Sequence, residues 1–131
     1  MTRRVARTCL VALAALVAGT GAGGCGECNR PDCGPAGVRI ELGLVGGAPE
    51  RAMVCVGGEC QEAQPDPDDP ARVFVPVADY DALPDEFRLT AEVVYPGEEP
   101  VSFTGSISKD TPRCGCPVTT ARARPDGSLR G

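Results

Sequence analysis

Hydrophobic and polar residues alternate with a period of two along most of the chain beyond residue 38. The alternation is clearest from Phe87 to Tyr95, where every second residue is apolar. This is the period of a strand with one buried face, and no window shows the period of about 3.6 residues that marks a helix. Glycine, proline and aspartate cluster between the alternating runs, as they do in turns. The pattern predicts seven strands, over residues 38–44, 52–56, 59–63, 73–77, 87–95, 101–108 and 116–124.

Seven short strands separated by turns predict an all-β fold, and more specifically an antiparallel, immunoglobulin-like β-sandwich. Residues 87–95 and 101–108 are expected to pair as a hairpin around the Pro96-Gly97 turn. The Cys and Trp signature of true immunoglobulin domains is missing, because the chain contains no Trp.

Prolines set two further expectations. Pro76 lies within the strand predicted over residues 73–77, and because proline has no N–H for a sheet ladder, this strand is expected at a sheet edge. Residues 64–70 are acidic and rich in proline. They are therefore expected to form a loop rather than a strand.

The first 24 residues have the layout of an export signal. Arg3, Arg4 and Arg7 precede an apolar run from Cys9 to Ala18. That run suits a signal-peptide core and is much shorter than the about 20 residues that a membrane-spanning helix needs. The sequence therefore predicts a cleaved signal peptide over residues 1–24, a cysteine-containing tether over 25–37 and a β-sandwich domain over 38–131.

The end of this segment, Ala22-Gly23-Gly24-Cys25, resembles the lipobox of bacterial lipoproteins. The resemblance implies that Cys25 becomes the mature N-terminus and carries a thioether-linked diacylglycerol, usually with a further acyl chain such as palmitate. Several chains anchor a protein durably in a membrane. Ala22 stands where that family usually has Leu, so cleavage by the ordinary signal peptidase after Ala22 or Gly24 is the alternative.

The number of cysteines agrees with lipidation. The chain has 8 cysteines, and loss of Cys9 with the signal leaves an odd number for an oxidising compartment. Modification of Cys25 restores an even six. A redox motif is the alternative for Cys25 and Cys28, which have C-x-x-C spacing, but no strand precedes the pair and no helix follows it.

Spacing indicates how these six cysteines pair. The turn residues Gly57-Gly58 place Cys55 opposite Cys60 in a hairpin, at the short end of the distances a disulfide tolerates. The other four are expected to join the N-terminal segment to the last strand, since two of them point to one face of that strand and need separate partners. A four-cysteine zinc site is the alternative, which oxidising conditions disfavour. The four residues are Cys28, Cys33, Cys114 and Cys116.

The later part of the chain also resembles small cysteine-containing lipoproteins of high-GC bacteria. These carry a Val-Cys-x-Gly/Asp-Gly-x-Cys hairpin, found here from Val54 to Cys60, and a late cysteine pair. The resemblance bears on fold rather than on molecular activity.

Composition excludes several function classes. The chain is acidic, with 13 basic against 18 acidic residues and a net charge of −5. Such a charge repels nucleic acid, which is therefore not an expected partner. The chain has no histidine, which removes Ser-His-Asp and Cys-His catalysis and most catalytic zinc sites. We accordingly expect neither an enzyme nor a cofactor.

Two surface features stand out as candidate binding groups. Asp66, Asp68 and Asp69 are closely spaced carboxylates that form a weak calcium candidate, with a solvated acidic loop as the alternative. Of the five aromatic residues, only Phe74 and Tyr80 fall outside the predicted core faces. We expect these two to pack between strands, with an exposed binding surface as the alternative.

These observations predict a lipid-anchored cell-envelope lipoprotein with a non-catalytic structural or protein-interaction β-sandwich. It would lie outside the cytoplasm, on the periplasmic or cell-surface side, held to a bacterial cell membrane by its lipid anchor and facing an unknown envelope protein partner. The alternative is a secreted inhibitor or ligand-binding module that uses the loops at 64–70 and 96–100.

Overall fold

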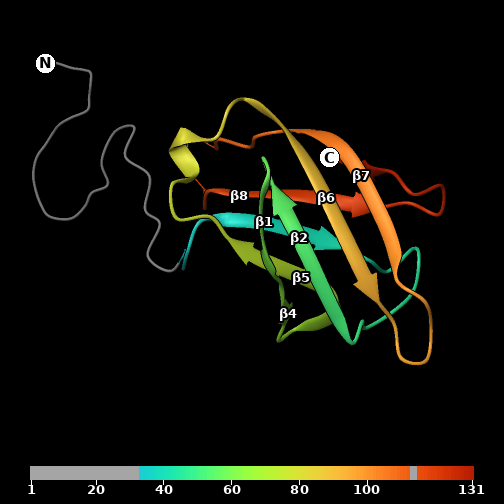
Figure 1. Ribbon diagram of the computed structural model, residues 1–131. Coiled ribbons are helices and arrows are strands. Elements are labelled where there is room, and N and C mark those ends of the chain that lie inside the picture. Colours follow the sequence, from blue (N-terminus) through green and yellow to red (C-terminus); the bar gives the residue numbers. More distant parts are fainter. Residues whose placement is uncertain (1–32, 113–114) are drawn as a thin grey trace, which may run out of the picture. The chain divides into compact units, whose positions relative to one another are not determined.

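The computed structural model describes residues 33–112 and 115–131 (Figure 1). The chain divides into two compact units. One comprises residues 1–33 and 112–116, and the other comprises residues 34–111 and 117–131. The second unit contains every strand that the structure describes.

Nine strands and one 3-10 turn, η1 (Tyr80–Ala82), make up the second unit. One sheet has five strands in the order β4-β5-β1-β8-β9, and the other has four in the order β3-β2-β6-β7. The strands are β1 (Gly37–Glu41), β2 (Arg51–Val56), β3 (Glu59–Glu62), β4 (Gln64–Asp66), β5 (Asp69–Pro76), β6 (Glu86–Val94), β7 (Val101–Ser108), β8 (Val118–Ala123) and β9 (Leu129–Arg130).

The all-β prediction is confirmed for the described part of the chain, and each of the seven predicted strands has a counterpart there. Only β4 and β9 were not anticipated. The prediction of a purely antiparallel fold is wrong, because β1 and β8 run parallel, with Gly37 opposite Val118 and Glu41 opposite Arg122. A parallel pair needs a long connection, and here the six strands between β1 and β8 supply it.

The first strand is shorter than predicted. Hydrophobic alternation continues to Leu44, but β1 ends at Glu41. The backbone then turns, because Val45 N and Gly46 N both donate to Leu42 O at 3.0 and 3.1 Å. Leu44 is consequently 58% exposed instead of buried.

Residues 64–70 form a hairpin, so the predicted loop is wrong. β4 pairs with the start of β5 around a turn in which Asp66 Oδ1 accepts a hydrogen bond from Asp68 N at 2.9 Å. An aspartate that bonds the backbone two residues on stabilises such a turn. Pro65 is tolerated because β4 is an outer strand of its sheet.

Pro76 does not mark an edge strand either, since β5 lies between β4 and β1. Val77 N donates to Ala36 O, so the odd-numbered residues of β5 direct their amides towards β1. The backbone nitrogen of Pro76 therefore points away from β1, to the side of β4. Pro76 lies beyond Phe74, the last β5 residue paired with β4, so its missing N–H costs no hydrogen bond between strands. Its carbonyl accepts a hydrogen bond from Gln61 Nε2 at 2.8 Å instead.

The two sheets are joined along both of their edges. On one side β3 runs directly into β4 through Ala63, which is buried and donates its N–H to Ala52 O. On the other side Thr104 of β7 bridges to Ser128, and Thr104 N donates to Gly127 O at 3.0 Å. These connections link an edge of one sheet to an edge of the other, and they shorten the exposed edges that would invite pairing with other chains.

The core lies between the inward faces of the two sheets, which are stacked in Figure 1. Phe87, Tyr95 and Phe103, the aromatics on the predicted core faces, are all buried there. Burial raises the pKa of Tyr95, with a smaller contribution from the Glu98 charge. Its ring packs so closely on Gly46 that a Cβ at that position would lie 2.5 Å from Tyr95 Cζ.

Tyr80 packs within the fold, as expected from sequence, and the alternative of a binding surface does not hold for it. It is buried in η1, between β5 and β6. Its hydroxyl hydrogen-bonds Thr119 Oγ1 at 2.6 Å and Asp110 O at 2.5 Å. Lys109 Nζ donates to Leu83 O at 2.8 Å and lies 5.8 Å from the Tyr80 ring centroid. This network connects the segments that cross between the sheets.

Gly105 tests the seam between β7 and β9. A Cβ at this position would lie 2.1 Å from Leu129 O, and a backbone atom cannot move away as a side-chain end can. We expect Gly105→Ala to lower the free energy of unfolding by about 3 kcal/mol, the upper range for overpacking. Gly47→Ala is the control, because its Cβ would meet nothing within 4 Å. Urea denaturation of both variants measures the difference. Equal stability of the two variants would contradict the close contact between Gly105 and Leu129.

Candidate functional site

The Cys55–Cys60 disulfide spans the hairpin of β2 and β3. The two residues lie directly opposite each other, with Cα atoms 3.9 Å apart. Gly57 and Gly58 have φ of 58° and 96°, a backbone conformation that glycine adopts without steric cost. This is the pairing that the Gly-Gly turn predicts.

The second disulfide joins Cys33 to Cys116, with Cα atoms 5.1 Å apart and a sequence separation of 83. Cys33 precedes β1 by four residues and Cys116 precedes β8 by two, so the bond links the approaches to two paired strands. A zinc site that uses these two sulfurs as thiolates is thereby contradicted. Cys25, Cys28 and Cys114 lie outside the described residues.

Two of the three carboxylates in the acidic turn of the β4–β5 hairpin bond to neighbouring groups of the protein. Asp66 accepts from Asp68 N through Oδ1 and from Arg72 Nε through Oδ2 at 3.0 Å. Asp69 Oδ1 accepts from Ala71 N at 3.1 Å. Within residues 33–112 and 115–131, no group of three or more His, Cys, Asp or Glu side chains is placed to hold a metal ion.

Asp66 is held in its charged form. The hydrogen bond from Asp68 N lowers the pKa of this carboxyl most, and the hydrogen bond and charge of Arg72 lower it further, while desolvation opposes them. In return, the Asp66 carboxylate raises the pKa of Arg72. The Asp66–Arg72 ion pair therefore connects the two strands of the hairpin.

Four connections gather at one end of the sandwich. They follow from strand direction, because β1 and β8 end where β4 ends and β5 begins, and β6 ends where β7 begins. The loops at 64–70 and 96–100, proposed from sequence as a binding surface, both contribute to this end. The connections are residues 42–50, 67–68, 95–100 and 124–128.

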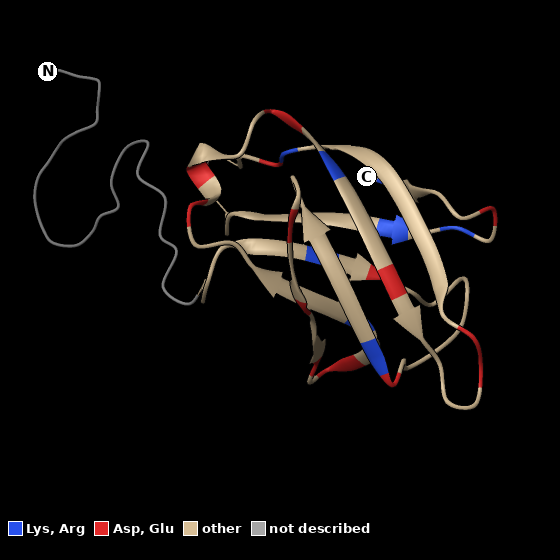
Figure 2. Ribbon diagram, viewed as in Figure 1, with Lys and Arg blue, Asp and Glu red and all other residues tan. Residues whose placement is uncertain are grey.

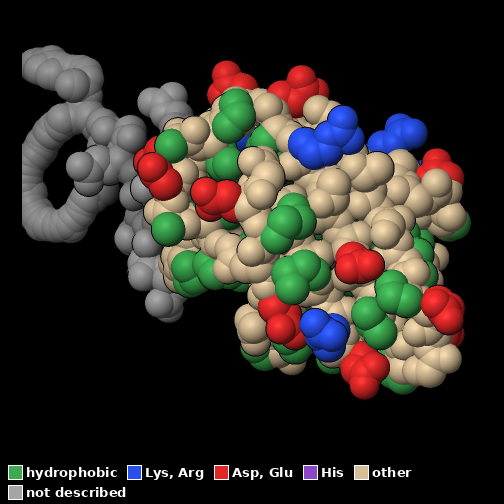
Figure 3. Space-filling view, viewed as in Figure 1, with side chains coloured by type: hydrophobic (Ala, Val, Ile, Leu, Met, Phe, Trp, Pro, Cys, Tyr) green, Lys and Arg blue, Asp and Glu red, His purple; other side chains and the backbone are tan. Residues whose placement is uncertain are grey.

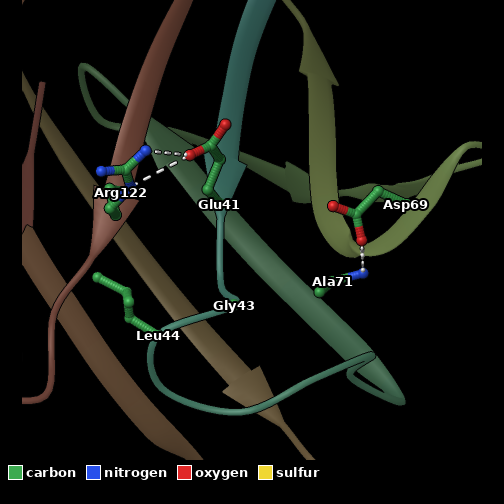
Figure 4. Close-up of a pocket in the computed structure, with 6 residues that line it drawn as sticks. All are labelled: Glu41, Gly43, Leu44, Asp69, Ala71 and Arg122. Atoms are coloured by element: carbon green, nitrogen blue, oxygen red, sulfur yellow. Dashed lines mark hydrogen bonds and ion pairs between the residues drawn. The ribbon is translucent and has the colours of Figure 1, made fainter.

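An open pocket of about 270 Å³ lies at this end, beside the five-stranded sheet (Figure 4). Glu41 and Arg122 point towards one another from β1 and β8, with Asp69 and Ala71 across the opening. Arg122 donates to Glu41 Oε1 through Nη2 at 2.9 Å and through Nε at 3.2 Å. Exposed Leu44 adds an apolar wall. The pocket thus combines the Glu41–Arg122 ion pair with the Asp69 carboxylate and two apolar side chains.

Charge is distributed unevenly over the second unit. In Figure 2 the acidic residues recur in turns and loops, whereas most of the basic residues lie on strands. The outward positions of the five-stranded sheet illustrate this, since Arg72, Glu41 and Arg122 stand side by side on three adjacent strands. Opposite charges on neighbouring strands stabilise a sheet.

Two residues before Glu41 on β1, Arg39 lies between Phe74 of β5 and Thr120 of β8. Arg39 is half-buried, and its Nε is shielded from water without a hydrogen-bond partner among the residues described. Phe74 is half-buried and packs against Gly37, where a Cβ would lie 2.6 Å from Phe74 Cζ. We call Arg39, Arg72, Phe74, Thr120 and Arg122 the arginine face.

Sequence reasoning found Phe74 but missed the arginines. Arg39, Arg72 and Arg122 each occupy a polar position of an alternating run, so their outward direction was readable. Their convergence was not, because it depends on the order of strands and on the parallel pairing of β1 with β8.

Comparison with protein-family models, curated proteins and solved structures gives no match for this chain. Within the described residues, none of the helical structure is long and apolar enough to cross a membrane. Function must therefore be inferred from the residues of the chain and their arrangement.

The two disulfides should differ in their contribution to stability. In a chain-entropy model the bond across 83 residues stabilises by about 4 to 5 kcal/mol and the one across five by about 2 kcal/mol. We expect Cys33→Ser/Cys116→Ser to lose correspondingly more than Cys55→Ser/Cys60→Ser in guanidinium denaturation. Equal losses would contradict this. The background should carry Ser at the three remaining mature cysteines, Cys25, Cys28 and Cys114.

Asp66 should make stability depend on pH. Its pKa is lowered in the folded state, so the unfolded state takes up the proton first as pH falls. Its contribution is full above the usual aspartate pKa of about 3.9, and it is lost as pH falls through the lower folded-state value. We therefore expect Asp66→Asn to be less stable than wild type at pH 7 and the gap to close on acidification.

Chemical denaturation across this pH range measures the gap. Asp68→Asn is the matched control, since it removes a charge from the same turn while the Asp68 N–H still bonds Asp66. At pH 7 its free energy of unfolding should stay within about 0.5 kcal/mol of wild type. A gap for Asp66→Asn that is constant with pH would contradict the assignment.

Proposed function

We propose that this chain is a lipid-anchored cell-envelope lipoprotein of a bacterium, with a β-sandwich displayed as a non-catalytic structural or protein-interaction module. The observation that carries the proposal is the N-terminal pattern, a basic start and a short apolar run that lead to Cys25. The cysteine count supports it independently, because a modified Cys25 leaves an even six to pair.

The disulfides indicate an oxidising compartment outside the cytoplasm. All four described cysteines are paired, two by two. Disulfides persist in secreted and periplasmic proteins and are rare in the cytosol. This supports export of the chain, although it does not bear on the anchor itself.

The path of the chain fits display on a tether. Residues 34–36 enter β1 at the end of the sandwich opposite the pocket. An anchor at Cys25 would hold the chain from that opposite end. A fully extended chain from Cys25 to β1 spans at most about 40 Å.

A binding role is better supported than a catalytic one. The chain has no histidine, and the Glu41 carboxylate in the pocket is paired with Arg122. A general acid or base needs a tuned pKa and a free position beside its substrate. We also propose the immunoglobulin-like type of sandwich, because hairpins alternate with crossings between the two sheets along the whole unit.

A secreted ligand-binding or inhibitory module is the second candidate. It is favoured by one observation, that the loops at 64–70 and 96–100 belong to the same end as the pocket. In this case the chain would bind through the same end of the sandwich but would have no lipid anchor. The two candidates therefore differ in whether Cys25 is lipidated.

Replacement of Cys25 distinguishes them. We expect wild type to sediment with membranes, to carry an acyl-modified Cys25 by mass spectrometry and to accumulate as precursor under globomycin. Cys25→Ser should move to the soluble fraction, because several acyl chains supply the anchoring. Cys9→Ser, in the signal segment, is the control and should stay with the membranes. Soluble wild type with an unmodified N-terminus would overturn lipid anchoring.

A further inference from the structure

We propose that the arginine face docks an acidic, extended segment of a partner protein, with Arg39 as its central anchor. The inference deepens the proposed function by naming a surface and the chemistry of its partner, and it rests on the interaction role proposed above. It does not depend on how the protein is anchored.

Strand register concentrates three arginines on this face. Glu41 of the central strand β1 stands opposite Arg72 on one side and Arg122 on the other, and Arg39 follows two residues away on the same side of β1. Next-but-one positions on a strand are about 7 Å apart, and adjacent strands are about 5 Å apart. The three guanidinium groups therefore share one patch that a single extended segment can cover.

The three arginines of this patch differ in how far their charge is compensated. Arg72 bonds Asp66 at 3.0 Å and Arg122 bonds Glu41 at 2.9 Å. Arg39 forms no ion pair within 4 Å in the described part of the chain. Three carboxylates, those of Glu41, Asp66 and Asp69, lie among the three arginines. None of them pairs with Arg39 within 4 Å, so this guanidinium offers local charge complementarity for a carboxylate of a partner.

Arg39 also has the properties of an interface anchor. Its side chain is half-buried and its Nε is already shielded from water without a hydrogen-bond partner. Docking a carboxylate against it therefore requires less additional ordering and desolvation than at a fully exposed arginine. Arginine is enriched among the residues that dominate binding energy.

Phe74 provides the apolar part of the face. Gly37 lets the Phe74 ring lie close to the sheet, and the ring remains half-exposed beside Arg39. Aromatic residues and arginine are the two classes most enriched at protein interfaces. A partner that alternates acidic and apolar side chains matches both.

The same face disfavours a dense polyanion. Asp66 and Glu41 stand between or beside the arginines, so a strand of closely spaced phosphates would meet carboxylates as well as guanidinium groups. The overall negative charge adds to this repulsion. An acidic peptide can place its carboxylates at the arginines alone, which is why we assign the face to a protein segment.

The outer face of the four-stranded sheet differs and supplies a control. Figure 3 looks onto it, and hydrophobic side chains there are separated by polar and charged ones. The outward residues of β7 are four exposed hydroxyls, and Arg88 donates to one of them, Thr104, at 3.2 Å. Arg88 carries the same charge as Arg39 but lies on the outer face of the other sheet, so it serves as the control. The hydroxyls belong to Ser102, Thr104, Ser106 and Ser108.

The test uses the full chain with Cys25→Ser, purified from an oxidising compartment. The probe is a fluorescein-labelled octapeptide of four Glu-Val repeats, with a Gln-Val octapeptide as its neutral counterpart. Fluorescence anisotropy is measured in about 50 mM NaCl, where screening is weak. We expect the Glu-Val peptide to bind at least about tenfold more tightly than the Gln-Val peptide.

Arg39→Gln should weaken Glu-Val binding by about tenfold or more, while Arg88→Gln, with the same loss of charge, should change it less than about twofold. Thermal unfolding followed by circular dichroism checks that both variants are folded. If Arg39→Gln does not fold, Thr120→Glu is used as the second variant. It places a negative charge beside Arg39 at an exposed position. It should also weaken Glu-Val binding by about tenfold.

Equal weakening by Arg39→Gln and Arg88→Gln would overturn the proposal, because net charge alone would then account for binding. Absence of Glu-Val binding would overturn it, as would tighter binding of inorganic polyphosphate than of the peptide. Because the assay uses unlipidated protein, a negative result leaves the anchoring proposal standing, and a failed anchoring test leaves this one standing.

Discussion

The closure of two sheets on one shared core is the constraint on which the rest of this structure depends. Each strand offers only one apolar face, and a small sheet cannot shield it alone. Ala63 lets a single strand leave one sheet and continue in the other, and Gly105 lets Leu129 approach β7 at the opposite seam. With both seams joined, every inward side chain meets a partner layer, and the outward side chains are left for charge and binding.

Closure also decides which outward residues become neighbours. β1 lies at the centre of its sheet, between an antiparallel and a parallel partner, and its approach is covalently linked by Cys33–Cys116 to that of β8. Arg39 and Glu41 are flanked on both sides by side chains from strands distant in sequence. Sites built on strands are positioned more accurately than sites built on mobile loops.

Stability and binding use the same charges on this face. The Arg72–Asp66 and Arg122–Glu41 pairs connect adjacent strands, and surface pairs of this kind contribute little each. They also give Arg72 and Arg122 carboxylate partners beside Arg39. A partner carboxylate then meets ordered groups, which lowers the entropic cost of association. The Asp66 carboxylate, with its lowered pKa, keeps its part of this arrangement charged down to acidic pH.

Local pattern determined the strands, their buried faces and the Cys55–Cys60 hairpin, because alternation and a Gly-Gly turn act within a few residues. It did not determine that residues 64–70 pair, that β1 stops at Glu41 or which groups the Tyr80 hydroxyl contacts, since these depend on particular hydrogen bonds that the alternation does not encode. The arginine face is the clearest case. Sequence showed Arg39, Arg72 and Arg122 pointing outward, but only strand order and register could bring them together, because those are set by packing between residues far apart in the chain.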